Sequence, residues 1–192
     1  MYSAGWAIWV VGLPGSGKSS LAKGLYDHLS TQGQNVVMLE MDKQRKQYFP
    51  DPTYSAQERE RAYGMFVDEA ADLVKHGRMV IMDGSAYQVA MRTYARQRIP
   101  RFAEIFVSCQ LDEATRREAL RPQGAVMAGL YAKAIERQQT GKQFDGLGEV
   151  IGVDVEFEVD PNAELIIDNT RLTKEETLGK ALHFLDSWLA SA

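Results

Sequence analysis

Residues 12–19 carry three glycines, a lysine and two serines at a spacing that suits phosphate binding. They read Gly-Leu-Pro-Gly-Ser-Gly-Lys-Ser, a complete G-x-x-x-x-G-K-[ST] loop. The glycines let main-chain N–H groups converge on one anion, Lys18 can reach the β- and γ-phosphates, and the Ser19 hydroxyl suits Mg²⁺. We therefore assign nine residues to nucleotide binding: Gly12, Leu13, Pro14, Gly15, Ser16, Gly17, Lys18, Ser19 and Ser20.

A loop of this kind needs a strand before it and a helix after it. The apolar run 6–11 supplies the strand, and the helical spacing continues through Leu21, Ala22, Leu25 and Leu29. A glycine-rich turn before a helix can also be only a turn, but the two flanking elements favour binding of ATP or GTP. The sequence has no Asn-Lys-x-Asp segment of the type that reads guanine, and we interpret Asn169-Thr170 as a turn. ATP is therefore favoured.

Acidic residues follow the second and third predicted strands. Glu40 and Asp42 leave strand 35–39, where a carboxylate can orient a substrate hydroxyl and accept its proton. We favour Asp42, because it lies nearer the end. Glu40 is the second candidate, and an ordinary polar strand end is the alternative. Strand 79–83 ends in Asp83, the Walker-B form in which the terminal carboxylate holds Mg²⁺. Many buried strands also end in an acidic residue. Asp83 is a candidate Mg²⁺ ligand because a phosphate loop is present in the same chain.

Other reactive residue types give weaker signals. Arg92 and Arg96 stand four residues apart and could present a cationic face to phosphate or sulfate, or could equally be exposed surface residues. Cys109 is the single cysteine and lies in an apolar run, which favours an inert buried thiol. The histidines have no mutual metal-ligand spacing.

The elements that must position these residues alternate between apolar runs and helical patterns, which predicts βαβ units around a parallel sheet. Capping-box patterns open two expected helices, 55–75 and 173–189. The predicted fold class is α/β, a P-loop NTPase fold with three α/β/α layers, forming one domain over residues 1–192. Loops after the strands should carry the site. We expect strands at 6–11, 35–39, 79–83, 103–109 and 164–168.

A basic segment punctuated by glycine runs over about 116–159. Beside a phosphate site such a segment favours a mobile lid whose arginines close on the transferring group. A solvated surface excursion is the alternative.

Composition excludes several other classes of function. The net charge of −4 and the scattered Lys and Arg argue against nucleic acid as the main partner. A single cysteine allows no internal disulfide, which fits a cytoplasmic protein, and no apolar run is long enough to indicate a membrane partner.

Taken together, these motifs resemble those of the adenylyl-sulfate (APS) kinase family. Asp42 and Arg45 match an Asp-Gly-Asp-x-x-Arg element, with Glu40 as a conservative departure. Tyr54-Ser55 and Arg59 resemble the substrate helix of that family, and 129–134 resembles its lid sequence Gly-Leu-Tyr-x-Lys-Ala. The resemblance implies transfer of the ATP γ-phosphoryl group to the 3′-hydroxyl of adenylyl sulfate with Mg²⁺, and a homodimer. It implies catalytic roles for Lys18 and Asp42 and substrate-binding roles for Asp42, Arg45, Tyr54, Arg59 and Tyr131.

The acceptor half departs from that family more than the donor half. Ala62 and Gly64 replace an asparagine and an arginine, the segment 85–87 replaces Ile-Ser-Pro, and Ala128 replaces a lysine. One alternative is therefore a kinase for another small molecule or nucleotide conjugate, such as a cytidine diphosphate derivative. An alternative of another class is a nucleotide-binding regulatory module without transfer.

Overall fold

Five parallel strands form the central sheet of the computed structural model, which describes residues 5–120 and 129–191. Their order is β2-β3-β1-β4-β5, and each lies within about two residues of its predicted bounds. Parallel neighbours need crossover connections, which helices supply here. This arrangement confirms the predicted α/β fold class. The bounds are β1 (Trp6–Val11), β2 (Val36–Glu40), β3 (Met79–Asp83), β4 (Phe102–Ser108) and β5 (Leu165–Asp168).

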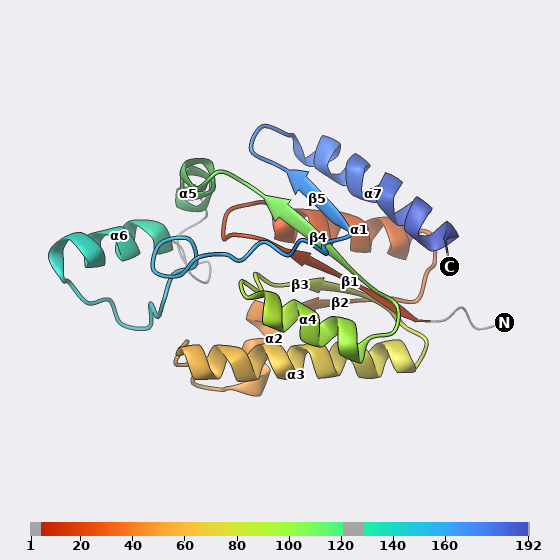
Figure 1. Ribbon diagram of the computed structural model, residues 1–192, viewed down its shortest axis with the longest axis horizontal. Helices are drawn as coiled ribbons and strands as arrows, with labels where there is room; N and C mark the ends of the chain where they lie inside the picture. The colour runs from red at the N-terminus through yellow and green to blue at the C-terminus, as the bar shows by residue number, and fades with distance from the viewer. Residues whose placement is uncertain (1–4, 121–128, 192) are drawn as a thin grey trace.

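Helices cover both faces of this sheet, and Figure 1 shows the layers edge-on. Helices α1 and α7 lie on one face, while α2, α3 and α4 lie on the other; α5 and α6 lie beyond the carboxyl ends of the strands. Of the predicted capping boxes, the one at Thr173 and Glu176 is fully formed at the start of α7. The bounds are α1 (Lys18–Thr31), α2 (Met41–Tyr48), α3 (Ala56–Lys75), α4 (Val89–Arg98), α5 (Leu111–Ala119), α6 (Leu130–Thr140) and α7 (Lys174–Ala190).

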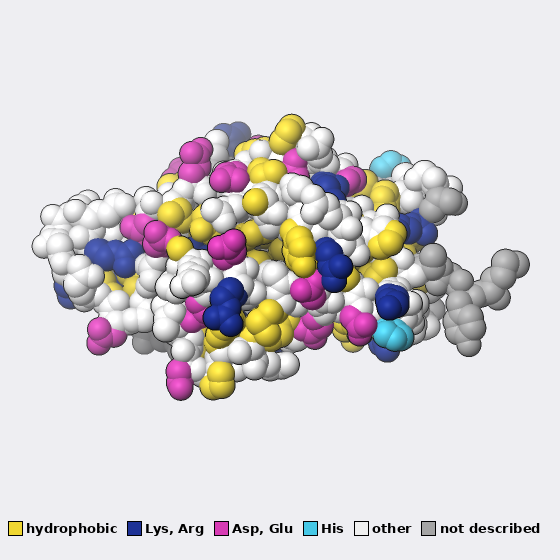
Figure 2. Space-filling view, turned by 60° about the horizontal axis from the view of Figure 1, so that its bottom comes forward, with side chains coloured by type: hydrophobic (Ala, Val, Ile, Leu, Met, Phe, Trp, Pro, Cys, Tyr) yellow, Lys and Arg dark blue, Asp and Glu magenta, His cyan; other side chains and the backbone are white. Residues whose placement is uncertain are grey.

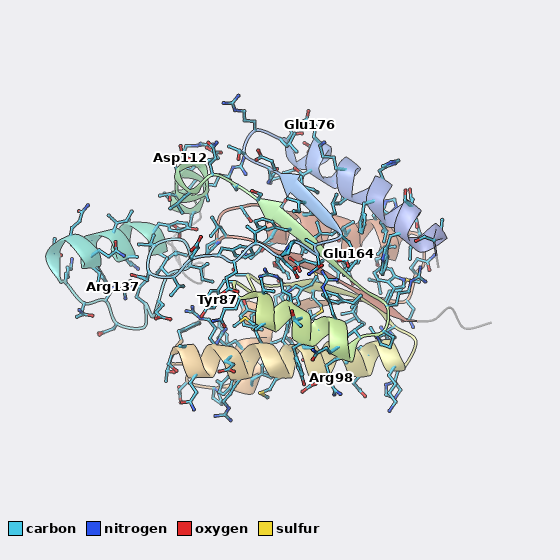
Figure 3. The ribbon with its side chains drawn as sticks, viewed as in Figure 1. Tyr87, Arg98, Asp112, Arg137, Glu164 and Glu176 are labelled. Atoms are coloured by element: carbon cyan, nitrogen blue, oxygen red, sulfur yellow. The ribbon has the colours of Figure 1, made fainter. Side chains whose placement is uncertain are left out.

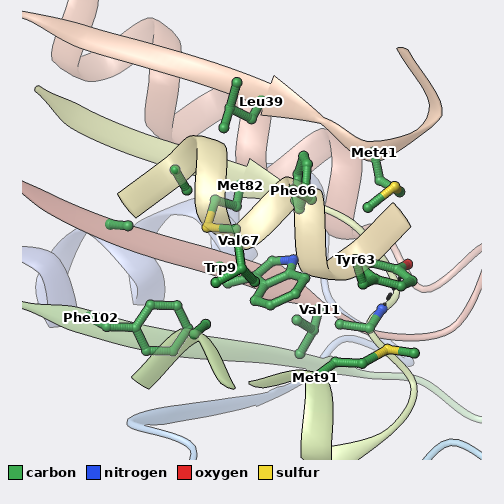
Figure 4. Packing of buried hydrophobic residues seen from close by; sticks show 14 of the residues in the cluster. Trp9, Val11, Leu39, Met41, Tyr63, Phe66, Val67, Met82, Met91 and Phe102 are labelled. Carbon is green, nitrogen blue, oxygen red and sulfur yellow. Dashed lines mark hydrogen bonds between the residues drawn. The ribbon is translucent and has the colours of Figure 1, made fainter. Parts of the chain in front are cut away.

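Strand β1 explains the two-sided core, because all six of its residues are buried. Successive side chains of a strand point to opposite faces, so Ile8 joins the cluster with α1 and α7 while Trp9 joins the cluster with α3. Trp9 packs 5.8 Å from Phe66 between ring centroids, as Figure 4 shows. Burial of such a side chain stabilises the fold by about 2–3 kcal/mol. The phosphate loop therefore leaves the most deeply buried part of the sheet.

The surface shown in Figure 2 intersperses Lys and Arg with Asp and Glu, without a patch of one sign. This is in line with the scattered basic residues of the sequence. In the part of the chain that the structure describes, no helix is long and apolar enough to cross a membrane.

The first residues of the segment predicted as a lid, about 116–159, belong to α5, which extends through Ala119. The second part of the predicted lid contains α6 and an irregular segment that returns to β5, and residues 121–128 lie outside the described residues. Carboxylates pair with its arginines: Arg116 and Arg117 contact Glu113, and Arg137 contacts Asp154. A role for these arginines in closing on the transferring group stays a prediction.

Candidate active site

The phosphate loop joins β1 to α1 and is held tightly by its neighbours. Gly15 has φ of 82°, and a Cβ there would lie 2.1 Å from the Ala114 carbonyl oxygen. Gly17 has φ of 102° and is the N-cap of α1. Lys18 is buried at the first helical position, with its Nζ 3.5 Å from the Leu13 carbonyl oxygen. The loop thus gathers N–H groups, the positive helix end and one cation at the carboxyl edge of the sheet.

Asp83 ends β3 in register with Val10 of β1 and Glu40 of β2, which brings its carboxylate to the phosphate loop. Burial raises the pKa of Asp83, whereas the Lys18 charge and a hydrogen bond with Ser19 lower it. Its Oδ1 is buried and has no hydrogen-bond partner among the described residues. An unpaired carboxylate oxygen beside a hydroxyl fits a hard cation such as Mg²⁺, which takes few protein ligands when phosphates supply others. The described ranges contain no group of three or more His, Cys, Asp or Glu residues that could hold a metal. A Mg²⁺ ion that also binds phosphates does not require such a group.

Asp42 reaches the site from a helix rather than from a strand. Strand β2 ends at Glu40 and α2 begins at Met41, so Asp42 lies in the first turn of α2 and not on an extension of the strand. A tight strand-to-helix change aims Glu40, Met41 and Asp42 at the same cavity. Asp42 is exposed there, so a substrate hydroxyl can reach it.

A cavity of about 190 Å³ lies between the phosphate loop and the start of α2 and α3. Besides Pro14 of the phosphate loop, it brings together seven further predicted site residues: Lys18, Ser19, Asp42, Arg45, Tyr54, Arg59 and Asp83. Met41, Tyr63, Leu130, Val150 and Ile151 add apolar surface, and Pro14, Glu40, Gly84, Ser85 and Glu149 complete the lining. Cations and carboxylates therefore meet around an apolar floor, a setting suited to a ligand that carries both a ring and anionic groups.

Glu58 holds one wall of this cavity. Its backbone N–H donates to Ser55, but its carboxylate does not return to Ser55, so the predicted capping box is only half formed. The carboxylate instead accepts hydrogen bonds from Thr53, from the Tyr54 N–H and from buried Arg45, whose Nη1 lies 3.2 Å away. Burial raises the pKa of Glu58, but these hydrogen bonds outweigh it and leave the pKa below its ordinary value.

Glu58 also stabilises an unusual backbone position. Tyr54 has φ of 54°, which is rare for a residue with a side chain, and the Arg45 guanidinium lies 5.2 Å from the centre of its ring. Because Glu58 holds its backbone and Arg45 packs on its ring, Tyr54 presents a fixed aromatic surface to the cavity.

Arg59 provides the clearest unpaired donor of the site. Its side chain is 5% exposed, its Nη2 donates to the Glu149 carbonyl at 2.8 Å, and the guanidinium lies 5.4 Å from the Tyr87 ring centre. Its Nη1 is buried and has no partner in the described part of the chain. A buried cationic donor without a partner is costly unless a ligand satisfies it.

Tyr131 does not line this cavity. It is fully buried and its hydroxyl donates to the Pro14 carbonyl at 2.9 Å, so it connects α6 to the phosphate loop. Direct contact of Tyr131 with a substrate stays a prediction; its neighbour Leu130 is the α6 residue that reaches the cavity.

A second cavity of about 580 Å³ lies on the other side of the phosphate loop. Gly15, Gly17, Ser19 and Ser20 line it together with Arg117, Leu120, Asn169, Leu172, Thr173, Lys174 and Thr177. The residues from α5 and α7 were not predicted, because they come from segments far from the motif. The polar turn Asn169-Thr170 after the last strand was the one sequence feature that could have pointed to this cavity.

Arg92 and Arg96 lie away from both cavities, and both sequence interpretations of them were wrong. Arg92 is fully buried with its Nε 3.1 Å from Glu104 Oε1, and Arg96 contacts Glu104, Asp160 and Glu164. Figure 3 shows Glu164 close to β4. Glu104 is a buried carboxylate inside β4 and requires cationic partners. Arg92 also donates to the carbonyls of Ala86 and Glu158, which makes its role structural.

The family described as adenylylsulphate kinase matches residues 4–168. The chain belongs to the adenylylsulphate kinase family. A probable adenylyl-sulfate kinase of Archaeoglobus fulgidus is 30% identical over 85% of this chain and 96% of its own length. A cytidine diphosphoramidate kinase of Campylobacter jejuni is 29% identical over 85% of both chains.

Among solved structures, an APS kinase of Mycobacterium tuberculosis in complex with AMPPNP and APS matches with a TM-score of 0.77, 23% identity and coverage of 96% and 99% of the two chains. It supports the fold. As an adenylylsulphate kinase family member, the chain is a phosphotransferase that acts on an alcohol group. A purely regulatory role is thereby set aside.

Proposed function

We propose that this protein transfers the γ-phosphoryl group of ATP to the 3′-hydroxyl of adenylyl sulfate. The observation that carries the proposal is the cavity in which Lys18, Ser19 and Asp83 lie on one wall while Arg45, Tyr54 and Arg59 lie on another, with Asp42 between them in the lining. Family membership supports this substrate pair.

The donor binds with its phosphates on the loop 12–19. Main-chain N–H groups and the N-terminus of α1 stabilise the phosphate charge, and Lys18 adds a full positive charge. The nucleoside extends into the second cavity, whose lining begins at the same loop residues Gly15 and Gly17. The phosphate loop therefore separates donor nucleoside from acceptor, and the γ-phosphate faces the cavity that contains Asp42.

Ser19 and Asp83 are the residues suited to hold Mg²⁺, because Oδ1 of Asp83 is buried without a partner beside the Ser19 hydroxyl. When bound, the cation neutralises charge that builds up between the β- and γ-phosphates.

Asp42 orients the acceptor hydroxyl and accepts its proton. The bond between the γ-phosphorus and the bridging oxygen of ADP breaks, a bond from the γ-phosphorus to the acceptor oxygen forms, and the proton passes to the Asp42 carboxylate and then to solvent. Lys18 stabilises the charge that develops on the leaving β-phosphate. Positioning and charge neutralisation supply most of the rate enhancement.

Arg59 is the principal acceptor contact, because it lines the cavity and its buried Nη1 has no partner among the described residues. An anionic group of the acceptor satisfies that donor. The Tyr54 ring and the apolar side chains of Leu130 and Val150 suit a nucleobase.

A nucleotide conjugate other than adenylyl sulfate is the second candidate acceptor. It is favoured by the relative from Campylobacter jejuni, whose identity of 29% is nearly equal to that of the archaeal relative.

Turnover assays with ATP and a panel of acceptors test the proposal. Adenylyl sulfate should be phosphorylated with the highest kcat/KM, whereas a cytidine diphosphate conjugate that outperforms it would replace it as the substrate. Asp42→Asn should lower kcat at least about 100-fold by removing the proton acceptor. Asp51→Asn, an exposed carboxylate outside the cavity lining, is the matched control and should leave kcat unchanged.

A further inference from the structure

Asn169 follows directly after β5, and its side chain contacts the phosphate loop. Its side chain is 6% exposed, and its Nδ2 donates to the Ser16 carbonyl at 2.7 Å. Its own backbone N–H donates to the Ser108 carbonyl at 2.8 Å, which fixes the residue beside the end of β4. A buried side chain from the far end of the chain thus holds one peptide group of the loop.

The Ser16 carbonyl fixes the direction of this amide, and Thr177 on α7 stabilises it. The Ser16 carbonyl can only accept, so the amide turns its NH₂ group toward it. Oδ1 then faces Thr177, which is 4% exposed and whose hydroxyl lies 2.5 Å from Asn169 Oδ1 and 2.8 Å from the Thr173 carbonyl oxygen. The single hydroxyl proton serves one of these two acceptors at a time, and its donation to Oδ1 satisfies the buried amide oxygen.

The held peptide group is the one between Ser16 and Gly17. A trans peptide is planar, and its C=O and N–H point in opposite directions. Fixing the Ser16 carbonyl toward Asn169 therefore aims the Gly17 N–H away from Asn169. The Ser16 N–H is already used, since it donates to the Leu13 carbonyl at 3.1 Å. Gly17 packs directly on the amide, because a Cβ there would lie 2.4 Å from Asn169 Nδ2.

We propose that Asn169 and Thr177 are positioning residues for phosphoryl transfer, which hold the Ser16–Gly17 peptide so that its N–H faces the triphosphate. This inference rests on ATP binding by the proposed function. It does not depend on which acceptor the enzyme uses. Because the two residues hold the loop that binds the β- and γ-phosphates, they affect the affinity for ATP.

The test compares Thr177→Val with Thr177→Ser by isothermal titration calorimetry with MgATP, and thermal unfolding checks the fold of each variant. Valine has nearly the shape of threonine but cannot donate, so Asn169 Oδ1 loses its partner and the amide is held less firmly. We expect Thr177→Val to weaken MgATP binding about 10-fold, the effect of losing one buried hydrogen bond. Thr177→Ser keeps the hydroxyl and should restore MgATP binding. Thr31→Val, at the exposed end of α1, is the matched control and should bind like the wild type.

Two results would overturn the inference: unchanged MgATP binding by Thr177→Val, or Thr177→Ser binding MgATP as weakly as Thr177→Val. If Thr177→Val does not fold, Asn169→Asp decides the question. It is isosteric but places a second oxygen against the Ser16 carbonyl, so it should bind MgATP more weakly, and unchanged binding would overturn the inference. Failure of the wild-type protein to bind MgATP would instead contradict the proposed function.

Discussion

Lys18 and Asp42 enter one cavity from different helices, α1 and α2, and each contributes a charge that the proposed transfer step uses. The neighbouring Asp83 and Arg59 share a different property, since each has a buried polar atom without a partner among the described residues. Unsatisfied buried groups are rare in folded proteins and cost about 1–3 kcal/mol each. Both residues line the cavity, which agrees with the proposal that substrate and cation complete the site.

Replacing Lys18 by methionine should abolish transfer without unfolding the protein. The substitution keeps the buried stem and removes the charge that stabilises the leaving phosphate, so kcat/KM should fall at least about 100-fold. Steady-state kinetics measure the loss, and thermal unfolding checks the fold. Lys23→Met is the control, because Lys23 is exposed on the same helix and pairs with Asp27. A Lys18→Met enzyme with near-normal turnover would remove Lys18 from the mechanism.

At the scale of elements, short connections decide the geometry of the site. The phosphate loop passes so close to α5 that Gly15 has no room for a side chain. On the acceptor side, α2 and α3 are tied together by Arg45 and Glu58, which also hold Thr53 and Tyr54. Rigid elements thus fix both the donor loop and the acceptor wall.

Gly15→Ala should prevent ATP binding, because its Cβ would clash with the Ala114 carbonyl oxygen and push the loop out of shape. Gly33→Ala is the control, because it introduces similar backbone strain without the clash. Gly33 has φ of 73°, close to the 82° of Gly15, but a Cβ there meets nothing within 4 Å. It should cost about 1 kcal/mol of stability and leave ATP binding intact, as measured by calorimetry and urea unfolding. Normal ATP affinity of Gly15→Ala would contradict the close approach.

The Glu58 cluster should make the protein sensitive to acid. Hydrogen bonds hold the pKa of Glu58 below its ordinary value of 4.5, so its contribution to the free energy of unfolding is present above pH 4.5 and is lost as the pH falls through the folded pKa. Urea unfolding of the wild type and of Glu58→Gln between pH 7 and pH 3 measures this. The difference between the two proteins should shrink toward low pH, and a difference that is constant with pH would show that Glu58 is not ionised in the folded protein.

At the scale of the whole molecule, the parallel sheet collects loops from distant parts of the chain at its carboxyl edge. Figure 1 shows α5 and α6 beyond this edge. Two cavities flank the phosphate loop there, so a donor and an acceptor can approach from opposite sides. We therefore expect ligand binding at the phosphate loop to stabilise the whole protein against unfolding.

MgATP should raise the thermal unfolding temperature. At a ligand concentration about 100-fold above Kd, binding adds about 2.7 kcal/mol to the free energy of unfolding, which corresponds to roughly 5–10 °C for a chain of this size. Differential scanning fluorimetry measures the shift, and chelation of Mg²⁺ with EDTA should reduce it. Equal shifts with and without the chelator would argue against a cation held by Ser19 and Asp83.

Local sequence determined the phosphate loop, the five strands and the fold class, because glycine spacing and hydrophobic periodicity report on neighbours along the chain. It also named Asp42, and the family resemblance added Arg45, Tyr54 and Arg59; the structure brings all four into one cavity. The predicted homodimer and the cytoplasmic location stay predictions.

Only the tertiary structure decided which polar residues pair over long distances. Arg92 and Arg96 became structural because Glu104 is buried in β4 and needs a counter-charge, a demand that helical spacing alone does not reveal. The support of Ser16 by Asn169 spans 153 residues, and no local pattern connects the two. Secondary structure follows from short-range preferences, whereas the pairing of buried polar groups depends on which segments the folded sheet brings together.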